Sequence, residues 1–170
     1  MSRVEARQRL PVPRPRLRRP GDEEARRETI PLIAKWAISR SLWVMVFGTG
    51  CCALEVMEAF TTRFDLERFG AMMAESPRRA DVLIVTGLIN ARVAEVIRRI
   101  YDQMPEPKYV IAVGACSMGG GPYHDSYSTA KRADEVVPVD IYVPGCPVRA
   151  EAVVEAIRLL QRRIYGKEAD

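Results

Sequence analysis

Four cysteines are the residues whose types and spacing could do chemistry in this 170-residue chain. Cys51 and Cys52 are adjacent, whereas Cys116 and Cys146 lie far along the sequence. We find no apolar run that predicts an export signal or a membrane span, so we do not expect a disulfide framework. In a reducing compartment such thiols act as metal ligands, catalytic groups or plain core residues, and their positions must decide between these roles.

Continuous apolar runs alternate with segments of helix-forming composition along most of the chain. The runs that predict buried strands are 43–47, 81–87, 108–114 and 136–145. The segments that predict helices are 51–60, 92–104 and 149–164. Strands that alternate with helices in this way predict a doubly wound α/β domain, in which helices cover both faces of a parallel sheet.

The predicted topology brings the cysteines to one edge of the sheet. Cys51 and Cys52 follow the first predicted strand, Cys116 follows the third, and Cys146 follows the fourth. Carboxyl ends of parallel strands share an edge, and ligands bind there. The segments GTGCC, GACSMGGG and PGCP contain glycine, which lets backbone approach a bulky group, and N–H groups in such loops can stabilise negative sulfur. A shared metal centre is therefore predicted.

Three other interpretations of the cysteines stay open at this point. They could be buried core residues, an all-cysteine zinc site, or a redox-active vicinal disulfide between Cys51 and Cys52. Core cysteines are more typical of strands than of glycine-flanked loops, and structural zinc sites normally use CxxC pairs, which this chain lacks. Two adjacent ligands on one cluster demand strained geometry, so the residues alone do not explain the CC pair.

The basic character of the chain belongs to an N-terminal arm, residues 1–28. Nine arginines stand against four acidic residues in positions 1–27, a balance of +5, so the rest of the chain sums to −1 of the total +4. Four prolines break any helix there. We expect this arm to be disordered or bound to a partner, either an acidic subunit or anionic lipid. The body shows no basic patch interleaved with aromatics, so we expect no nucleic-acid partner.

A short helix is predicted where the folded domain begins, capped by Thr29 and with Pro31 in its first turn. The apolar residues that share one side of it are Ile30, Ile33, Trp36 and Ala37. We interpret this side as packed on the domain's own core, with an interface to a partner as the alternative.

Four long blocks of the sequence resemble one known family. They are FGTGCCALEVM, SPRRADVLIVTG, YDQMPEPKYVIAVGACSMGGG and VPVDIYVPGCPVRAEAVVEAI, and the likeness runs from about residue 30 to 165. The family is the B-type (PSST-type, 20 kDa) iron–sulfur subunit of respiratory complex I, the NADH:quinone oxidoreductase. The resemblance implies a flavodoxin-like doubly wound parallel sheet of about four strands over residues 29–165, followed by a short tail at 166–170.

The resemblance also implies a cofactor. Cys51, Cys52, Cys116 and Cys146 match the family's ligands to one 4Fe–4S cluster, and the adjacent pair is the family's own signature. This cluster is the terminal one of the electron chain, and it reduces quinone in two one-electron steps. Because GACSMGGG lacks the spacing of a dinucleotide fingerprint, the chain alone should not oxidise NADH and is an enzyme only as a subunit.

Partners follow from the same resemblance. They are a large hydrogenase-like subunit that supplies the principal His and Tyr for quinone, an upstream ferredoxin-like iron–sulfur subunit, and membrane-arm subunits of a proton-translocating complex. Quinone would bind between this chain and the large subunit. The expected location is peripheral, on the cytoplasmic or matrix-equivalent face of the energy-converting membrane, with no transmembrane segment in the chain itself.

Four further residues match family positions linked with quinone or proton coupling: Glu55, Met57, Asp65 and Asp81. The family's CCxxE pattern suggests that Glu55 influences cluster or quinone chemistry, and Met57 would form an apolar wall for quinone. The ordinary alternative is a capping or ion-pair role for the acids. For Met57, and for Met45, it is a place in the core.

Two local features are expected to matter less. His124, near Tyr123 and Tyr127 in the glycine-rich loop 116–128, is predicted to pack on a partner rather than to titrate beside a redox centre. Val148 stands where many relatives have a second proline, which implies a slightly looser loop after Cys146.

Two rival functions stay open. The small subunit of a membrane-associated NiFe hydrogenase shares the fold, but those chains typically show CxxC at the first site, so the CC pair favours complex I. A structural subunit stabilised by zinc is the alternative from another class.

Overall fold

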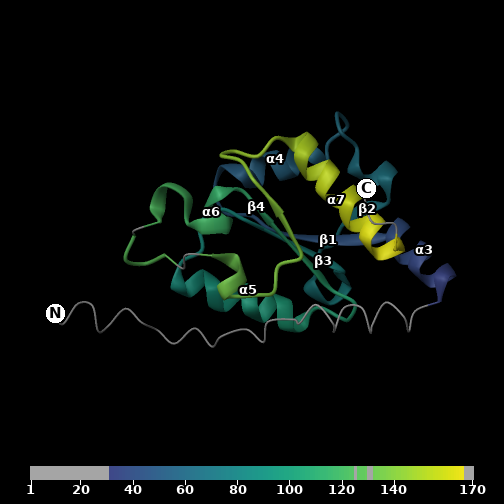
Figure 1. The fold of residues 1–170 in the computed structure, drawn as a ribbon, viewed down its shortest axis with the longest axis horizontal. Helices are drawn as coiled ribbons and strands as arrows, with labels where there is room; N and C mark the ends of the chain where they lie inside the picture. The colour runs from purple at the N-terminus through teal and green to yellow at the C-terminus, as the bar shows by residue number, and fades with distance from the viewer. Residues whose placement is uncertain (1–30, 125, 130–131, 167–170) are drawn as a thin grey trace.

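The computed structural model describes residues 31–124, 126–129 and 132–166 (Figure 1). The predicted arm, the Thr29 cap and residues 167–170 of the predicted tail lie outside this part of the chain. The described residues form a parallel five-stranded sheet with helices on both faces. The predicted doubly wound α/β fold is therefore confirmed.

The strand order is β2-β1-β3-β4-β5, and every neighbouring pair is parallel. The strands are β1 (Leu42–Phe47), β2 (Ala71–Met73), β3 (Val82–Thr86), β4 (Tyr109–Val113) and β5 (Ile141–Val143). This is the flavodoxin-like order, which reverses between β1 and β3. In such sheets ligands bind beyond the carboxyl ends of the strands.

Two packed layers surround the sheet because side chains alternate along each strand. Val82 and Ile84 of β3 pack in a core with α4 (Cys51–Ala59) and α7 (Ala150–Tyr165). Leu83 and Val85 point the other way, into a core with α5 (Ala91–Gln103). In Figure 1, α4 and α7 lie above the sheet and α5 lies below it.

Local sequence explains where the long helices begin and which face they bury. Asn90 caps α5, because its Oδ1 accepts the Val93 N–H at 2.8 Å. The predicted face of α7 is buried as expected, with Val153, Ile157, Leu160 and Ile164 in the core. Gly166, at φ 85°, ends α7 in the left-handed conformation.

The structure differs from the sequence prediction in three elements. The fifth strand, β2, was not predicted, because its three residues are too few to carry a period and it forms by pairing with β1. Strand β5 is shorter than predicted, since only Ile141–Val143 of the run 136–145 pair with β4. Cys116 lies in the short helix α6 (Ala115–Gly119) rather than in a loop.

The helix α3 (Leu32–Arg40) does not bury the side that was predicted to pack on the core. Ile33 is 81% exposed and Trp36 is 55% exposed, while Ala37 is also exposed. Only Ile38 packs partly against the core, and Ser39 is buried. The interpretation of α3 as an ordinary core-packed amphipathic helix is therefore wrong.

Candidate metal centre

The four cysteines lie past the carboxyl ends of three strands. Cys51 and Cys52 open α4 directly after β1, Cys116 lies in α6 after β4, and Cys146 follows β5. The backbone joins two of these segments, since the N–H of Ala115 donates to the carbonyl oxygen of Gly145 at 2.9 Å. The cysteines therefore lie at the carboxyl edge of the sheet, where the sequence predicted them.

The segment before Cys51 is held to the end of β3 by paired threonines. The N–H of Thr49 donates to Oγ1 of Thr86 at 3.2 Å, and Oγ1 of Thr49 donates to the Thr86 carbonyl oxygen at 2.7 Å. Thr86 is fully buried, and Gly87 follows at φ 75°. These two hydrogen bonds form a clamp between Thr49 and Thr86. The clamp holds the N-terminus of α4 between the carboxyl ends of β1 and β3, where the strand order reverses. Sequence reasoning missed it, although Thr-Gly recurs after both strands, in FGTG and IVTG.

The thiols are close enough to alter one another's ionisation. Burial raises the pKa of the Cys52 thiol, the N–H of Val148 opposes this by donating to the sulfur, and the adjacent Cys51 raises it further. Burial also raises the pKa of the Cys116 thiol, and the Cys146 and Cys51 thiols add to that rise. A metal cation at this edge would favour the thiolate form of these groups, which is the form that binds metal.

The backbone around the sulfurs leaves room for a bulky group and directs donors toward it. A Cβ on Gly114, at φ 92°, would lie 2.6 Å from Sγ of Cys52, and one on Gly121 would lie 3.2 Å from Sγ of Cys116. Val148 is 1% exposed and donates its N–H to Cys52. A proline at position 148 has no such donor. The residue that departs from the family's pattern therefore provides an N–H···S contact, and the looser loop stays a prediction.

Four thiols are a ligand set for more than one kind of metal centre. Among the described residues, which include all four cysteines, no group of three or more His, Cys, Asp or Glu side chains is spaced to hold one metal ion. A tetrahedral zinc site needs every sulfur about 2.3 Å from a single point. A four-iron cluster instead takes one cysteine sulfur at each of its irons. The role of the cysteines as its ligands stays a prediction.

Two of the other candidate residues lie on α4, the helix that also carries Cys51 and Cys52. Glu55 is half-buried on α4, one helical turn after Cys51, so the two share a face of the helix. Met57, on the same helix, is 46% exposed, which is inconsistent with a core role. Met45, in contrast, is half-buried against the core on the α5 side, as the ordinary interpretation expected.

Asp65 and Asp81 lie near the amino ends of the strands, away from the cysteines. Asp81 immediately precedes β3, and Asp65 precedes the turn that leads into β2. Asp81 has a clear structural role, since its Oδ2 accepts the Trp43 N–H at 3.1 Å while its own N–H donates to the Trp43 carbonyl oxygen at 2.8 Å. Asp140 repeats this pattern with Val110 before β5. The geometry of Asp81 matches the capping alternative.

Burial raises the pKa of Asp81 above its ordinary value of 3.8, although the Trp43 N–H lowers it in part. The folded state therefore binds this proton more tightly than the unfolded state, and ionisation from about pH 4 upward lowers the free energy of unfolding. Asp81→Asn keeps an oxygen that accepts the Trp43 N–H but cannot ionise, so we expect it to remove that loss. The free energy of unfolding should rise by less than about 1 kcal/mol, because the side chain is half exposed.

Chemical denaturation of wild type and Asp81→Asn between pH 4 and 7 tests this expectation, with Glu75→Gln as a control for an exposed carboxylate. The difference in stability should grow with pH more for Asp81→Asn than for Glu75→Gln. A constant difference for Asp81→Asn would show that Asp81 does not titrate in this range.

His124 is exposed at the end of the 3-10 turn Gly121–Tyr123, and Tyr123 and Tyr127 are exposed beside it. Contact of these exposed residues with a partner, which the sequence suggested, stays a prediction.

The fold and the sequence together define the class: a flavodoxin-like α/β subunit with four cysteines at the carboxyl edge of its sheet. The chain belongs to the family of the NADH ubiquinone oxidoreductase 20 kDa subunit, whose model matches residues 50–160. It is thus an oxidoreductase-type subunit related to those of respiratory membrane complexes, and the resemblance seen in the sequence is confirmed.

One solved structure extends the comparison beyond complex I. The chain is similar to a subunit of the membrane-bound sulfane sulfur reductase, an archaeal respiratory membrane complex, with 41% identity and a TM-score of 0.77. The match covers 83% of this chain and 80% of that chain. None of the helices in the described part has the length and hydropathy to cross a membrane.

Proposed function

We propose that this chain is the electron-transfer subunit of a complex I-type quinone reductase and holds one 4Fe–4S cluster on Cys51, Cys52, Cys116 and Cys146. The observation that carries the proposal is the convergence of these four thiols at one sheet edge, each within electrostatic reach of another. A centre of this kind supplies one-electron transfer when it is bound.

The chain's own residues would tune and shield that centre. The Val148 N–H lies against Cys52, where it stabilises negative charge on sulfur. Burial of Cys52, which is 3% exposed, excludes water from one side. Cys51 and Cys146 are exposed, so the opposite side is open toward a neighbouring subunit or acceptor.

A partner would complete this open side. Exposed apolar side chains occupy the helix that carries the CC pair and the edge strand next to β1: Leu54, Met57, Met72 and Met73. Such residues mark a protein interface when they lie beside a functional edge. We place the large hydrogenase-like subunit here, with quinone between the two chains, Met57 as an apolar wall and Glu55 near the cluster. The upstream iron–sulfur subunit and membrane-arm subunits complete the complex on the cytoplasmic or matrix-equivalent face of the membrane.

A second candidate acceptor rests on one observation. The similar subunit at 41% identity belongs to a sulfane sulfur reductase, so the same cysteine centre could deliver electrons to sulfane sulfur rather than quinone. The two functions share the cluster and differ in the acceptor.

Anaerobic purification of the native complex tests both parts of the proposal. We expect iron and acid-labile sulfide in equal amounts, and the reduced complex should pass electrons to a short-chain quinone faster than to polysulfide. Zinc without sulfide would contradict the cluster. Iron and sulfide with polysulfide reduction alone would keep the cluster and replace the acceptor, and a nickel-containing partner would indicate a hydrogenase.

A further inference from the structure

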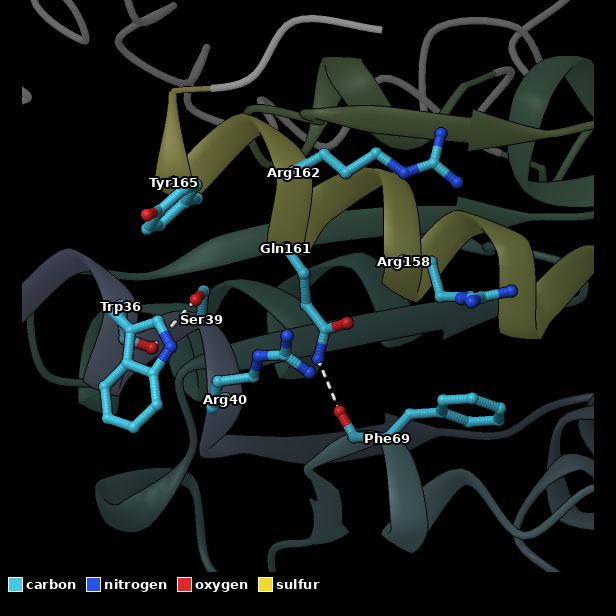
Figure 2. Close-up of a pocket in the computed structure, with 8 residues that line it drawn as sticks. All are labelled: Trp36, Ser39, Arg40, Phe69, Arg158, Gln161, Arg162 and Tyr165. Carbon is cyan, nitrogen blue, oxygen red and sulfur yellow. Dashed lines mark hydrogen bonds between the residues drawn. The ribbon is translucent and has the colours of Figure 1, made fainter.

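A hollow lies far from the cysteine edge, between α3 and α7. Its volume is about 410 Å³, and Figure 2 shows the side chains around it. In Figure 1, α3 and α6 lie at opposite ends of the sheet, so this hollow is separate from the cysteine centre. Its aromatic and cationic lining residues are Trp36, Phe69, Tyr165, Arg40, Arg158 and Arg162.

The hollow carries an excess of positive charge. None of its lining residues is acidic. Arg162 pairs with Glu155 at 2.6 Å, and Arg158 lies over the Phe69 ring at 5.0 Å. The three guanidiniums carry three positive charges. The Glu155 carboxylate supplies one negative charge, and the C-termini of α3 and α7 each supply about half of one, so about one positive charge is left over. A single anionic group, such as a phosphodiester, would balance it.

Helix ends alone do not account for these arginines. Arg40 and Arg162 lie in the last turns of α3 and α7, where the helix dipole favours a cation. Arg158 lies one turn earlier on α7, at the spacing that brings it beside Arg162, and like charges at this spacing repel each other. In Figure 2, Arg40 reaches from α3 toward Gln161 of α7, so both helices contribute guanidiniums to the hollow.

An exposed apolar stripe continues from the charged hollow. Leu32, Trp36 and Arg40 recur at every fourth position of α3, so they lie along one face of the helix. Leu32 is 66% exposed and Ile33, beside it, is 81% exposed. A cationic end followed by an apolar end, with a tryptophan between, is the pattern of a membrane-interface helix.

We propose that this hollow binds an anionic phospholipid, with its phosphodiester between Arg40 and Arg158 and its acyl chains along Trp36 and Leu32. The chain's own arm is strongly basic, so its charge does not fit the site. An acidic peptide would satisfy the arginines but would place backbone polar groups on the apolar stripe. The proposal draws on the family's association with membrane complexes and does not depend on the cluster or on the electron acceptor.

Quenching of Trp36 fluorescence by brominated acyl chains tests the proposal in the full chain. Trp43→Phe leaves Trp36 as the single tryptophan. In this background we compare vesicles of brominated phosphatidylcholine with vesicles that also contain brominated phosphatidylglycerol. We expect strong quenching with phosphatidylglycerol, little with phosphatidylcholine alone, and little competition from free glycerol phosphate.

Charge-matched variants separate the hollow from the basic arm, which is present in all of them. Arg40→Gln with Arg158→Gln should weaken phosphatidylglycerol binding by about tenfold or more, at roughly 1 kcal/mol per charge. Arg78→Gln with Arg92→Gln, two exposed arginines elsewhere, should leave it unchanged. Arg40→Lys with Arg158→Lys should retain most of the binding, which excludes misfolding as the cause.

Three outcomes would overturn the proposal. They are equal loss of binding in the two glutamine pairs, equal quenching by neutral and anionic vesicles, and displacement of the lipid by glycerol phosphate or an acidic peptide at similar concentration. The last would assign the site to a soluble anion or a protein partner.

Discussion

Cys116→Ala is expected to abolish the 4Fe–4S EPR signal that we assign to this chain and to lower electron delivery to the acceptor by more than about 100-fold. Loss of an outer partner of a metal ligand already costs 10–100-fold, and here a ligand itself is removed. The remaining thiols cannot replace it, since Cys51 and Cys146 lie on different segments on either side of the site. Iron and sulfide in the isolated complex should fall by the content of one cluster.

Met118→Leu provides the matched control, because it changes a half-buried apolar residue in the same short helix without touching a thiol. Its EPR signal and electron delivery should equal those of the wild type. An intact 4Fe–4S signal in Cys116→Ala would remove this residue from the ligand set.

Gly87→Ala is expected to lower the free energy of unfolding by about 3 kcal/mol or more. A Cβ at this position would lie 1.6 Å from the carbonyl oxygen of Thr49, and the backbone φ of 75° disfavours alanine even without that clash. The clamp between Thr49 and Thr86 must then open, which moves the start of α4 and the CC pair. For a chain of this size the midpoint of thermal unfolding should fall by roughly 6–12 °C.

Gly119→Ala is the control for this substitution. Gly119 ends α6 close to the same site, and a Cβ there meets nothing within 4 Å. Its free energy of unfolding should lie within about 0.5 kcal/mol of that of the wild type. A wild-type midpoint in Gly87→Ala as well would show that the clamp is not needed to position α4.

The sequence by itself determined the class of fold and the grouping of the cysteines. Continuous apolar runs such as 81–87 indicate a strand of a parallel sheet that is covered by helices on both faces, because the side chains on both faces are then buried. In a parallel sheet the carboxyl ends of the strands share one edge. Cys51, Cys116 and Cys146 each follow a strand, so they lie at that edge although they are far apart in the sequence. The adjacent pair was explained only by family resemblance.

Only the tertiary structure decided which strands, helices and side chains lie beside one another. Strand β2 exists because β1 offers it an unpaired edge, and three residues carry no periodic signal of their own. The Thr49–Thr86 clamp and the Val148 N–H on Cys52 join residues distant in sequence. The exposed face of α3 depends on which neighbours cover it, and apolar spacing alone does not record that. Such contacts depend on distances between elements, whereas sequence periodicity reports only the burial of each element.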